Sequence, residues 1–164
     1  MTANLKRALA CCCFGIGLAL LGSSAAEPWQ VVTVNRASLE GTLKDGTEFE
    51  VRVESQEPKE AAANYFGATG KPRSVVSDII MKVGGKRISF PDPSFNDLAD
   101  ALLQTLSITS QSSGEVKLRF TGGEGDVSYE VEYFIEGNRL VRRTVSYFER
   151  GAEQKDRVIK TMTF

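Results

Sequence analysis

Cysteine and histidine supply many catalytic nucleophiles, bases and metal ligands, and this chain has very few of them. Its three cysteines are adjacent, Cys11, Cys12 and Cys13, and there is no histidine in 164 residues. Zinc sites need spacings such as C-x2-C that let both sulfurs face one ion, and three consecutive cysteines do not provide one. As small apolar residues, the cysteines instead fit a hydrophobic leader segment.

The first 26 residues have the order of parts that is typical of a secretory signal peptide. Lys6 and Arg7 are positive, Ala8 to Leu21 is an uncharged apolar run, and Ser24 to Ala26 offers small residues for cleavage. The apolar run is shorter than the roughly 20 residues of a membrane-spanning helix. We expect cleavage after Ala26, export to the periplasm or the cell exterior, and no stable membrane insertion of the mature chain.

A lipoprotein that begins at Cys11 is the alternative to a cleaved signal peptide. The tripeptide before Cys11 places Leu9 one position later than bacterial lipobox sequences do, and only three residues separate Arg7 from the cysteine. Export signals carry about 7 to 15 apolar residues, so a lipidation site here follows too short a segment. The spacing favours signal cleavage, and lipidation at Cys11 stays the minor alternative.

Residues 27–164 would form a mature chain without cysteine or histidine. Loss of Lys6 and Arg7 from 20 basic residues leaves 18 against 21 acidic residues, a net charge of −3. Ser-His-Asp and Cys-His catalysis are excluded, as are sites with histidine or thiolate ligands, and we expect neither metal nor cofactor. The charge balance gives no reason to expect a nucleic-acid partner. A chain of this length can form a single domain without disulfides.

Alternating apolar and polar residues recur in segments of about six to ten residues, which is the pattern of half-buried strands. The expected strand segments are Trp29 to Val34, Leu39 to Leu43, Phe49 to Val53, Val75 to Val83, Ile88 to Phe90, Val116 to Phe120, Val127 to Ile135, Leu140 to Phe148 and Arg157 to Phe164. Residues 27–164 are therefore expected to form a single β-rich domain.

The stretch FPDPSFNDLADALLQTL, Phe90 to Leu106, breaks the alternation. Ser94, with Asp97 three residues later, resembles a capping box. The apolar residues on one helical stripe are Phe95, Leu98, Ala99, Leu102, Leu103 and Leu106. The spacing predicts one main helix, about Ser94 to Gln104, and a weaker helix at Pro58 to Tyr65. The expected fold is mostly β (α+β): a curved antiparallel sheet or partly open barrel of about seven to nine strands packed on that main helix.

Turn chemistry predicts strand register, because a slip of one residue reverses every side chain. A three-residue loop at Lys44 to Gly46 pairs Leu39 with Val51 and gives the glycine the left-handed position that such loops need. In the later hairpin with a Gly-Asn turn, only an odd-length loop puts Val141 and Val145 on the face of Val131 and Tyr133.

A pair of carboxylates is the catalytic arrangement that the composition leaves open. Glu130 and Glu132 lie two residues apart on one expected strand and so about 7 Å apart. Glycosidases use two carboxyls about 5 to 9.5 Å apart. The more ordinary role of such residues is cross-strand pairing, here with Arg142 or Arg143 on the next strand.

Two further segments have the composition of a binding site. Thr121 to Asp126 is a glycine-rich acidic loop, but it lacks the spacing of an EF-hand, so a hairpin connection is expected. A basic cluster would suit a sugar or an acidic partner if its aromatic neighbours are exposed, and it is otherwise a charged outer sheet face. The cluster and its neighbours are Arg139, Arg142, Arg143 and Arg150 with Tyr133, Tyr147 and Phe148.

These observations favour an exported, non-enzymatic binding or interaction domain whose ligand is an unknown protein or glycan, held in the concavity of the sheet or at an edge strand. No catalytic residue is identified. One alternative is a carboxylate-dependent hydrolase of an envelope or extracellular glycan, which requires a deep pocket with two close carboxylates. The other is a structural envelope component, which requires a large flat apolar patch.

Overall fold

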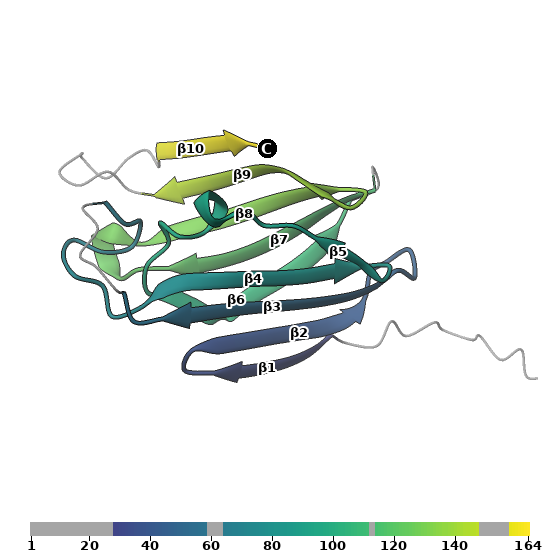
Figure 1. Ribbon diagram of the computed structural model, residues 1–164, viewed down its shortest axis with the longest axis horizontal. Coiled ribbons are helices and arrows are strands. Elements are labelled where there is room, and N and C mark those ends of the chain that lie inside the picture. Colours follow the sequence, from purple (N-terminus) through teal and green to yellow (C-terminus); the bar gives the residue numbers. More distant parts are fainter. Residues whose placement is uncertain (1–27, 59–63, 112–113, 148–157) are drawn as a thin grey trace, which may run out of the picture.

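The described part of the chain consists almost entirely of antiparallel strands. A computed structural model describes residues 28–58, 64–111, 114–147 and 158–164 (Figure 1). The first sheet contains β1 (Trp29–Thr33), β2 (Arg36–Thr42), β3 (Glu48–Gln56), β4 (Val75–Val83) and β5 (Lys86–Ile88). The second contains β6 (Ala101–Ser110), β7 (Glu115–Gly122), β8 (Tyr129–Glu136), β9 (Arg139–Tyr147) and β10 (Val158–Thr163). The prediction of a single antiparallel β-rich domain is confirmed.

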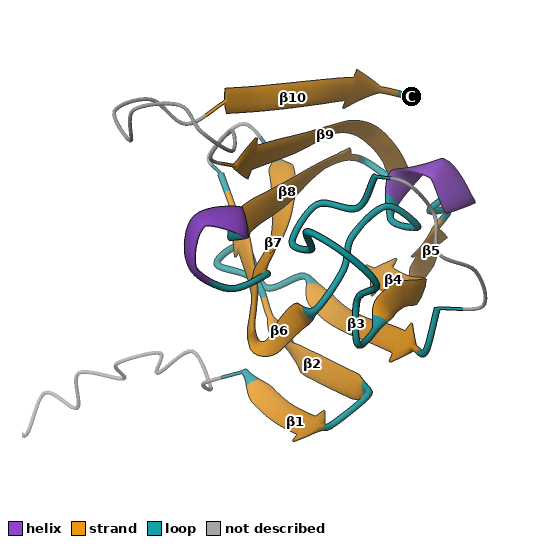
Figure 2. Cartoon of the chain, turned by 90° about the vertical axis from the view of Figure 1, so that its left-hand side faces the viewer, coloured by secondary structure: helices purple, strands orange, loops and turns teal. Residues whose placement is uncertain are grey.

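Each sheet is a five-stranded meander in which neighbours along the chain are neighbours in the sheet. Figure 1 shows β1 and β10 at opposite outer edges of the molecule, and Figure 2 shows loops running between the two sheets. The sheets approach each other where β2 contacts β6. The described strands form two separate sheets and do not close into a barrel.

The alternation of β3 shows how the core is built. Phe49, Val51 and Val53 are buried, while Glu50 and Glu54 lie on the opposite face of the sheet. Successive side chains of a strand point to opposite faces, so every second residue of β3 enters the space between the sheets. The apolar residues of β2, β4, β7, β8 and β9 meet them there in one continuous core.

The main helix predicted at Ser94 to Gln104 is wrong. One 3-10 turn, η1 (Asp92–Ser94), is followed by an irregular segment, and β6 begins at Ala101. Ser94, the expected capping residue, is buried, and its hydroxyl has no hydrogen-bond partner among the described residues. Asp100 has a positive φ of 48°, which a right-handed helix does not accommodate.

A bulge in β6 explains why the sequence resembles a helix. The pairing of β6 with β7 jumps from Leu102 to Ser107, so Leu103 and Leu106 are both buried although they lie three residues apart. Thr105 Oγ1 donates to the Leu102 carbonyl at 2.7 Å, and it accepts the N–H of a β7 threonine at 2.9 Å, which replaces the interrupted ladder. Buried residues spaced three apart can therefore come from a bulged strand as well as from a helix. The described residues form ten strands, not the expected seven to nine.

The register predicted for the β2–β3 hairpin is confirmed. Leu39 lies opposite Val51, Leu43 N–H donates to the Thr47 carbonyl at 2.8 Å, and Gly46 has a φ of +86°. Glycine has no Cβ that opposes this conformation, so the three-residue loop forms without strain.

In the β8–β9 hairpin, a bulge and not the length of the loop produces the expected orientation of the side chains. Glu136 pairs with Arg139 across a two-residue turn, so the predicted odd-length loop is wrong. A bulge at Val141 supplies the odd residue instead, and Val145 lies opposite Val131 as expected.

The weaker helix predicted at Pro58 to Tyr65 and the leader at residues 1–26 lie wholly or mostly outside the described residues. Among the described residues, no helix has the length and apolar character needed to cross a membrane.

Candidate functional site

The two carboxylates singled out on β8 are members of a charged sheet face. Glu132 pairs with Lys117 at 3.0 Å, and Glu130 pairs with Arg119. Both cations come from β7, so the expected pairing with the arginines of β9 is wrong, although the cross-strand charge pairing itself is present. Each carboxylate has a cation of its own, which is the ordinary arrangement of a solvated strand.

The basic cluster of β9 does not form an exposed surface with the tyrosines of β8. Arg142 lies on the outer face, with its guanidinium 4.0 Å from the centroid of the Phe134 ring. Arg143 points inward and is 2 % exposed, and the adjacent Tyr133 is fully buried. Phe148 and Arg150 lie outside the described residues. The interpretation of this cluster as a sugar or acidic-partner site is therefore wrong.

The glycine-rich stretch Thr121 to Asp126 connects β7 to β8, as expected of a hairpin connection. It contains the start of a 3-10 turn, η2 (Gly125–Val127), and Glu124 pairs with Arg73 at 2.6 Å. In the described ranges, no group of three or more acidic, cysteine or histidine side chains is arranged to hold a metal ion.

An open groove of about 590 Å³ lies where the segment between β5 and β6 passes the start of β4. Four parts of the chain line it: the end of β3, two loop residues well before β4, the first three residues of β4, and η1 with the residues that follow. The lining residues are Gln56, Asn64, Tyr65, Val75, Val76, Ser77, Asp92, Phe95, Asn96 and Asp97. We call this site the crossover groove. Its volume lies within the roughly 300 to 1,000 Å³ of small-ligand sites.

Backbone hydrogen bonds fix the walls of the crossover groove. Phe66 N–H donates to the Asp97 carbonyl, Ala99 N–H donates to the Phe66 carbonyl, and Val76 N–H donates to the Leu98 carbonyl, each at 2.9 Å. The segment from η1 to β6 is therefore held between a loop on one side and β4 on the other. A groove with hydrogen-bonded walls is largely formed before a ligand arrives, which reduces the ordering that binding requires.

Asp100 anchors the loop that enters β4. Its Oδ1 accepts the backbone N–H groups of Arg73 at 3.0 Å and Ser74 at 2.9 Å. This double contact with a distant segment of the chain holds the aspartate at its positive φ, a region that short polar side chains tolerate better than most others. A hydrogen bond and the charge of Glu124, with the charge of Asp100 beside them, raise the pKa of Arg73.

A buried ion pair lies beneath the crossover groove. Arg143 Nη2 donates to Asp97 Oδ1 at 2.6 Å, and Nη1 donates to the Pro93 carbonyl at 3.3 Å. Tyr133 Oη donates to the Ser94 carbonyl at 2.8 Å. Two inward side chains of the second sheet thus hold the backbone of η1 and the carboxylate that borders the groove.

Burial raises the pKa of Tyr133 and of Tyr129 well above the usual value for tyrosine. Both phenols are therefore protonated at neutral pH, and Tyr133 acts as a hydrogen-bond donor. Tyr129 is 1 % exposed, and its hydroxyl has no hydrogen-bond partner among the described residues.

This difference makes the two tyrosines a matched pair for substitution. Tyr129→Phe is expected to leave the free energy of unfolding unchanged or to raise it by up to about 1 kcal/mol, because it removes a buried hydroxyl without a partner. Tyr133→Phe is expected to lower it by about 1 to 2 kcal/mol, because the buried Ser94 carbonyl loses its donor. Urea unfolding of both variants measures the difference. Equal losses in the two variants would contradict this assignment.

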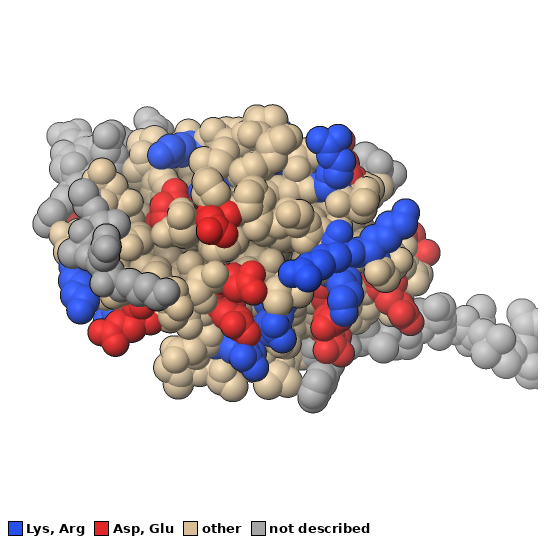
Figure 3. Space-filling view, viewed as in Figure 1, with Lys and Arg blue, Asp and Glu red and all other residues tan. Residues whose placement is uncertain are grey.

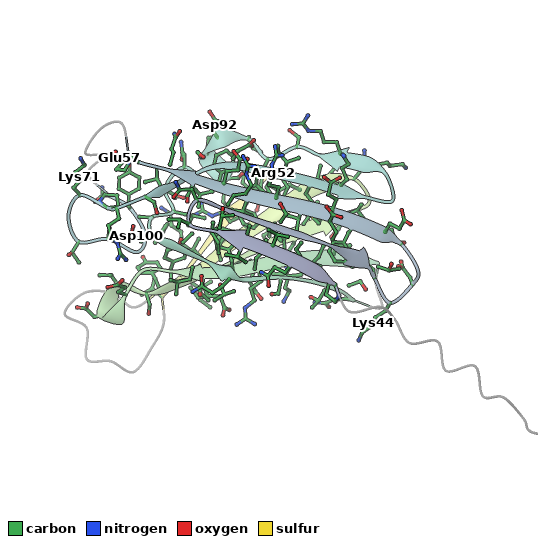
Figure 4. All side chains as sticks on the ribbon, turned by 90° about the horizontal axis from the view of Figure 1, so that it is seen from below. Lys44, Arg52, Glu57, Lys71, Asp92 and Asp100 are labelled. Carbon is green, nitrogen blue, oxygen red and sulfur yellow. The ribbon has the colours of Figure 1, made fainter. Side chains whose placement is uncertain are left out.

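The side chains of the crossover groove combine planar polar groups with an apolar floor. Asn64, Asn96 and Gln56 offer amide donors and acceptors, Tyr65 offers a half-buried ring, and Phe95 contributes to the floor. The charged side chains among the lining residues are carboxylates, and Figure 4 shows one of them, Asp92, projecting outward. This composition offers hydrogen-bond partners to a ligand with many hydroxyl groups and gives no cation to a ligand that binds through its negative charge alone.

A second groove, of about 530 Å³, lies along β2, β3 and β4. Thr42 and Glu40 border it, and an ion pair of 2.8 Å between Lys82 and Glu50 lies beside them. Figure 3 shows acidic and basic side chains close together on the face it displays, not a single extended patch of one sign. The second groove lacks the amide cluster of the crossover groove.

The sequence pattern does not identify Asp92, Asn96 and Asp97 as groove residues, because it predicts a helix and its approach in that stretch. The signal that was available is the composition of PDPSFND, which has two prolines with aspartate, serine and asparagine between apolar segments. Such clusters are typical of turns and loops.

Comparison with known proteins finds no relative of this chain. No protein-family model, no curated protein sequence and no solved structure matches it. The function must therefore be argued from the residues and geometry of the chain itself.

Proposed function

We propose that the chain is an exported, non-enzymatic binding domain whose crossover groove takes a hydroxyl-rich ligand, most simply a glycan. The observation that carries this proposal is the set of amide, carboxylate and hydroxyl side chains around one open groove of about 590 Å³. Sugar hydroxyls both donate and accept hydrogen bonds, and side-chain amides and carboxylates match them in pairs.

The apolar part of the groove fits the same ligand class. Val75 and Phe95 are largely buried, and they form an apolar floor beneath the polar rim. Ligand sites usually join a mainly apolar surface to a few placed polar groups that fix orientation. The C–H faces of a sugar ring would lie on this floor, while the rim residues bind its hydroxyls.

Export is supported by the order of charged, apolar and small residues in the first 26 positions. The periplasm and the extracellular space contain abundant glycans, which agrees with the proposed ligand class. The leader is proposed to be cleaved after Ala26, which gives a mature chain without a lipid anchor. Mass spectrometry of the protein from its native source tests this, and a lipidated chain starting at Cys11 would contradict it.

Binding of soluble peptidoglycan fragments and a panel of polysaccharides tests the site. Asn96→Ala is expected to weaken binding of any bound glycan about tenfold, because one or two hydrogen bonds of about 1 kcal/mol each are lost. Asn96 is exposed, so the fold should keep its stability. Isothermal titration calorimetry measures the affinity.

Asn138→Ala is the matched control, because Asn138 is an exposed asparagine in the β8–β9 turn and does not line the groove. Its affinity should equal that of the unchanged protein. Equal weakening in both variants, or no binding to any member of the panel, would contradict the proposal.

Incubation of the protein with the same glycans, followed by analysis of the products, distinguishes the two alternative functions. Asp92 and Asp97 border one groove, which is the feature a carboxylate-dependent hydrolase would use, but Asp97 is tied to Arg143 by an ion pair. Release of reducing sugar ends would favour the hydrolase, and glycans that bind unchanged favour the binding domain. A structural envelope component predicts no glycan binding at all.

A further inference from the structure

The outer edge of the first sheet is uncharged and apolar. From Trp29 to Val34 the chain has no charged residue. Val31 is 41 % exposed, Val32 42 % and Val34 94 %, and these are three of the four large apolar side chains exposed among the described residues. Figures 1 and 2 place β1 at the outer edge of its sheet. An edge with these properties is a template for pairing with another strand.

The other sheet edges carry features that oppose such pairing. β5 has three residues, and two of them are Lys86 and Arg87. β10 carries Lys160 in its interior, and β6 is interrupted by its bulge. Short length, charge and bulges are the ways in which proteins protect sheet edges. By comparison β1 is unprotected.

The register of the β1–β2 hairpin identifies the free hydrogen-bonding groups of β1. Thr33 lies opposite Arg36 across a two-residue turn, and such a turn is closed by a hydrogen-bonded pair. In an antiparallel ladder these pairs alternate with non-hydrogen-bonded pairs. The N–H and C=O groups of Gln30 and Val32 therefore point away from β2, toward the open edge.

We propose that a second copy of this chain pairs with β1, strand against strand and antiparallel, about a two-fold axis at Val31. This register overlaps the whole strand, placing Val31 opposite its counterpart and Gln30 opposite Val32 of the other copy. Each Gln30–Val32 pair exchanges two backbone hydrogen bonds between groups that point to the edge. The two five-stranded sheets become one ten-stranded sheet.

The self-complementary character of β1 is the reason for choosing a second copy as the occupant. Two-fold antiparallel pairing brings the strand against itself, and every opposed pair is uncharged. A two-fold axis at Lys160 of β10 would instead set two Lys160 side chains directly opposite each other. Like charges on facing strands are destabilising, so the charge pattern separates these two edges.

The position of Val32 adds an apolar contribution to the pairing. Val32 lies opposite Ala37 in the register and hence on the face of the sheet that Ala37 and Leu39 direct into the core. Both β2 residues are buried, whereas Val32 stays 42 % exposed, so β1 extends past the edge of the core. A paired second copy would extend the sheet beside Val32 and cover part of this apolar surface.

Sedimentation equilibrium of the purified protein over a range of concentrations tests the dimer. The unchanged protein should approach twice the monomer mass, and Val31→Lys should weaken association tenfold or more, since two lysines then face each other at the axis. Val32→Pro should do the same, because it removes an N–H that points to the edge, and proline is tolerated at that position of an edge strand.

Ile159→Lys is the matched control, because Ile159 is the exposed apolar side chain of the β10 edge, at 65 % exposure. It should associate as the unchanged protein does. An unchanged protein that stays monomeric at all concentrations would overturn the proposal, as would equal weakening by Ile159→Lys. Glycan binding at the crossover groove is measured separately, so failure of the dimer leaves the proposed function untouched.

Discussion

Asp97→Ala is expected to lower the free energy of unfolding by about 3 kcal/mol, the lower end of the loss that follows when one partner of a buried ion pair is removed. Arg143 is 2 % exposed, and Asp97 is its carboxylate partner at 2.6 Å. Without that carboxylate, the guanidinium stays buried and its main remaining hydrogen bond is the 3.3 Å contact with the Pro93 carbonyl. That contact keeps the loss near the lower end of the range.

Replacement of Arg143 should lower the free energy of unfolding by less than replacement of Asp97. Asp97 is 27 % exposed, so in Arg143→Met its carboxylate can turn toward water. The loss is expected to be about 1 to 2 kcal/mol, from the lost hydrogen bonds and the carbonyl left without a donor. This asymmetry distinguishes a buried cation that needs its carboxylate from a simple loss of contacts.

Urea unfolding of Asp97→Ala, Arg143→Met and the double variant measures these losses. The double variant should lose less than the two single variants together, since it leaves neither charge behind. Additive losses would show that the two side chains act independently. A larger loss for Arg143→Met than for Asp97→Ala would contradict the assignment of the arginine as the dependent partner.

Gly123→Ala is expected to destabilise the fold by about 3 kcal/mol, and Gly125→Ala by about 1 to 2 kcal/mol. Both glycines have positive φ, 72° and 58°, so both variants suffer the same kind of backbone strain. They differ in their surroundings. A Cβ at Gly123 would lie 2.7 Å from Gly67 Cα and 2.7 Å from the Val127 carbonyl oxygen, whereas a Cβ at Gly125 meets nothing within 4 Å.

The difference in stability between these two variants measures the close packing of the Gly123 loop against the Gly67 loop. The atoms near Gly123 belong to the backbone, which cannot rotate aside as a side chain can, so the overlap must be relieved by moving the Gly67 loop. That loop leads into the wall of the crossover groove through Phe66. Thermal unfolding of both variants provides the measurement, and equal shifts in the midpoint temperature would contradict a close contact between the loops.

The parts of the fold that sequence predicts well are those fixed by neighbouring residues. The Asp-Gly turn and the alternation on both sides of it determine the β2–β3 register, with Leu39 opposite Val51. Burial on one face then follows from the period of two. These features need no information from distant parts of the chain.

The segment from η1 to β6 could not be predicted in the same way. A bulge places Leu103 and Leu106 on one buried side, which reproduces helical spacing within a strand. A bulged strand can be distinguished from a helix here only when β7 is known to pair with this segment, since Thr105 is hydrogen-bonded to Thr121 sixteen residues away. Tertiary pairing overrides the local pattern in such a segment.

The parity of β9 residues in the sequence indicates part of the reason why Arg143 points inward. The same parity that places Val145 opposite Val131 places Arg143 opposite Tyr133, on the buried face. Arginine usually faces solvent, so its charge alone predicts the outer face for Arg143. The partner that makes burial acceptable, Asp97, lies 46 residues earlier in the chain and could not be identified from one sequence.

The crossover groove itself is a product of the tertiary fold. Gln56, Tyr65, Ser77 and Asn96 come from separate segments that the two meanders and the chain between them bring together. Each residue alone has the composition of an ordinary loop or strand end. The proposed ligand rests on the grouping of their polar side chains.

The most direct test of the proposed function is a titration of isotope-labelled protein with soluble peptidoglycan fragments and the polysaccharide panel, followed by amide NMR shifts. Binding in the crossover groove predicts concentration-dependent shifts at Tyr65, Ser77 and Asn96, with the Asn138 amide unchanged. Shifts confined to other parts of the molecule, or no shifts with any member of the panel, would contradict it.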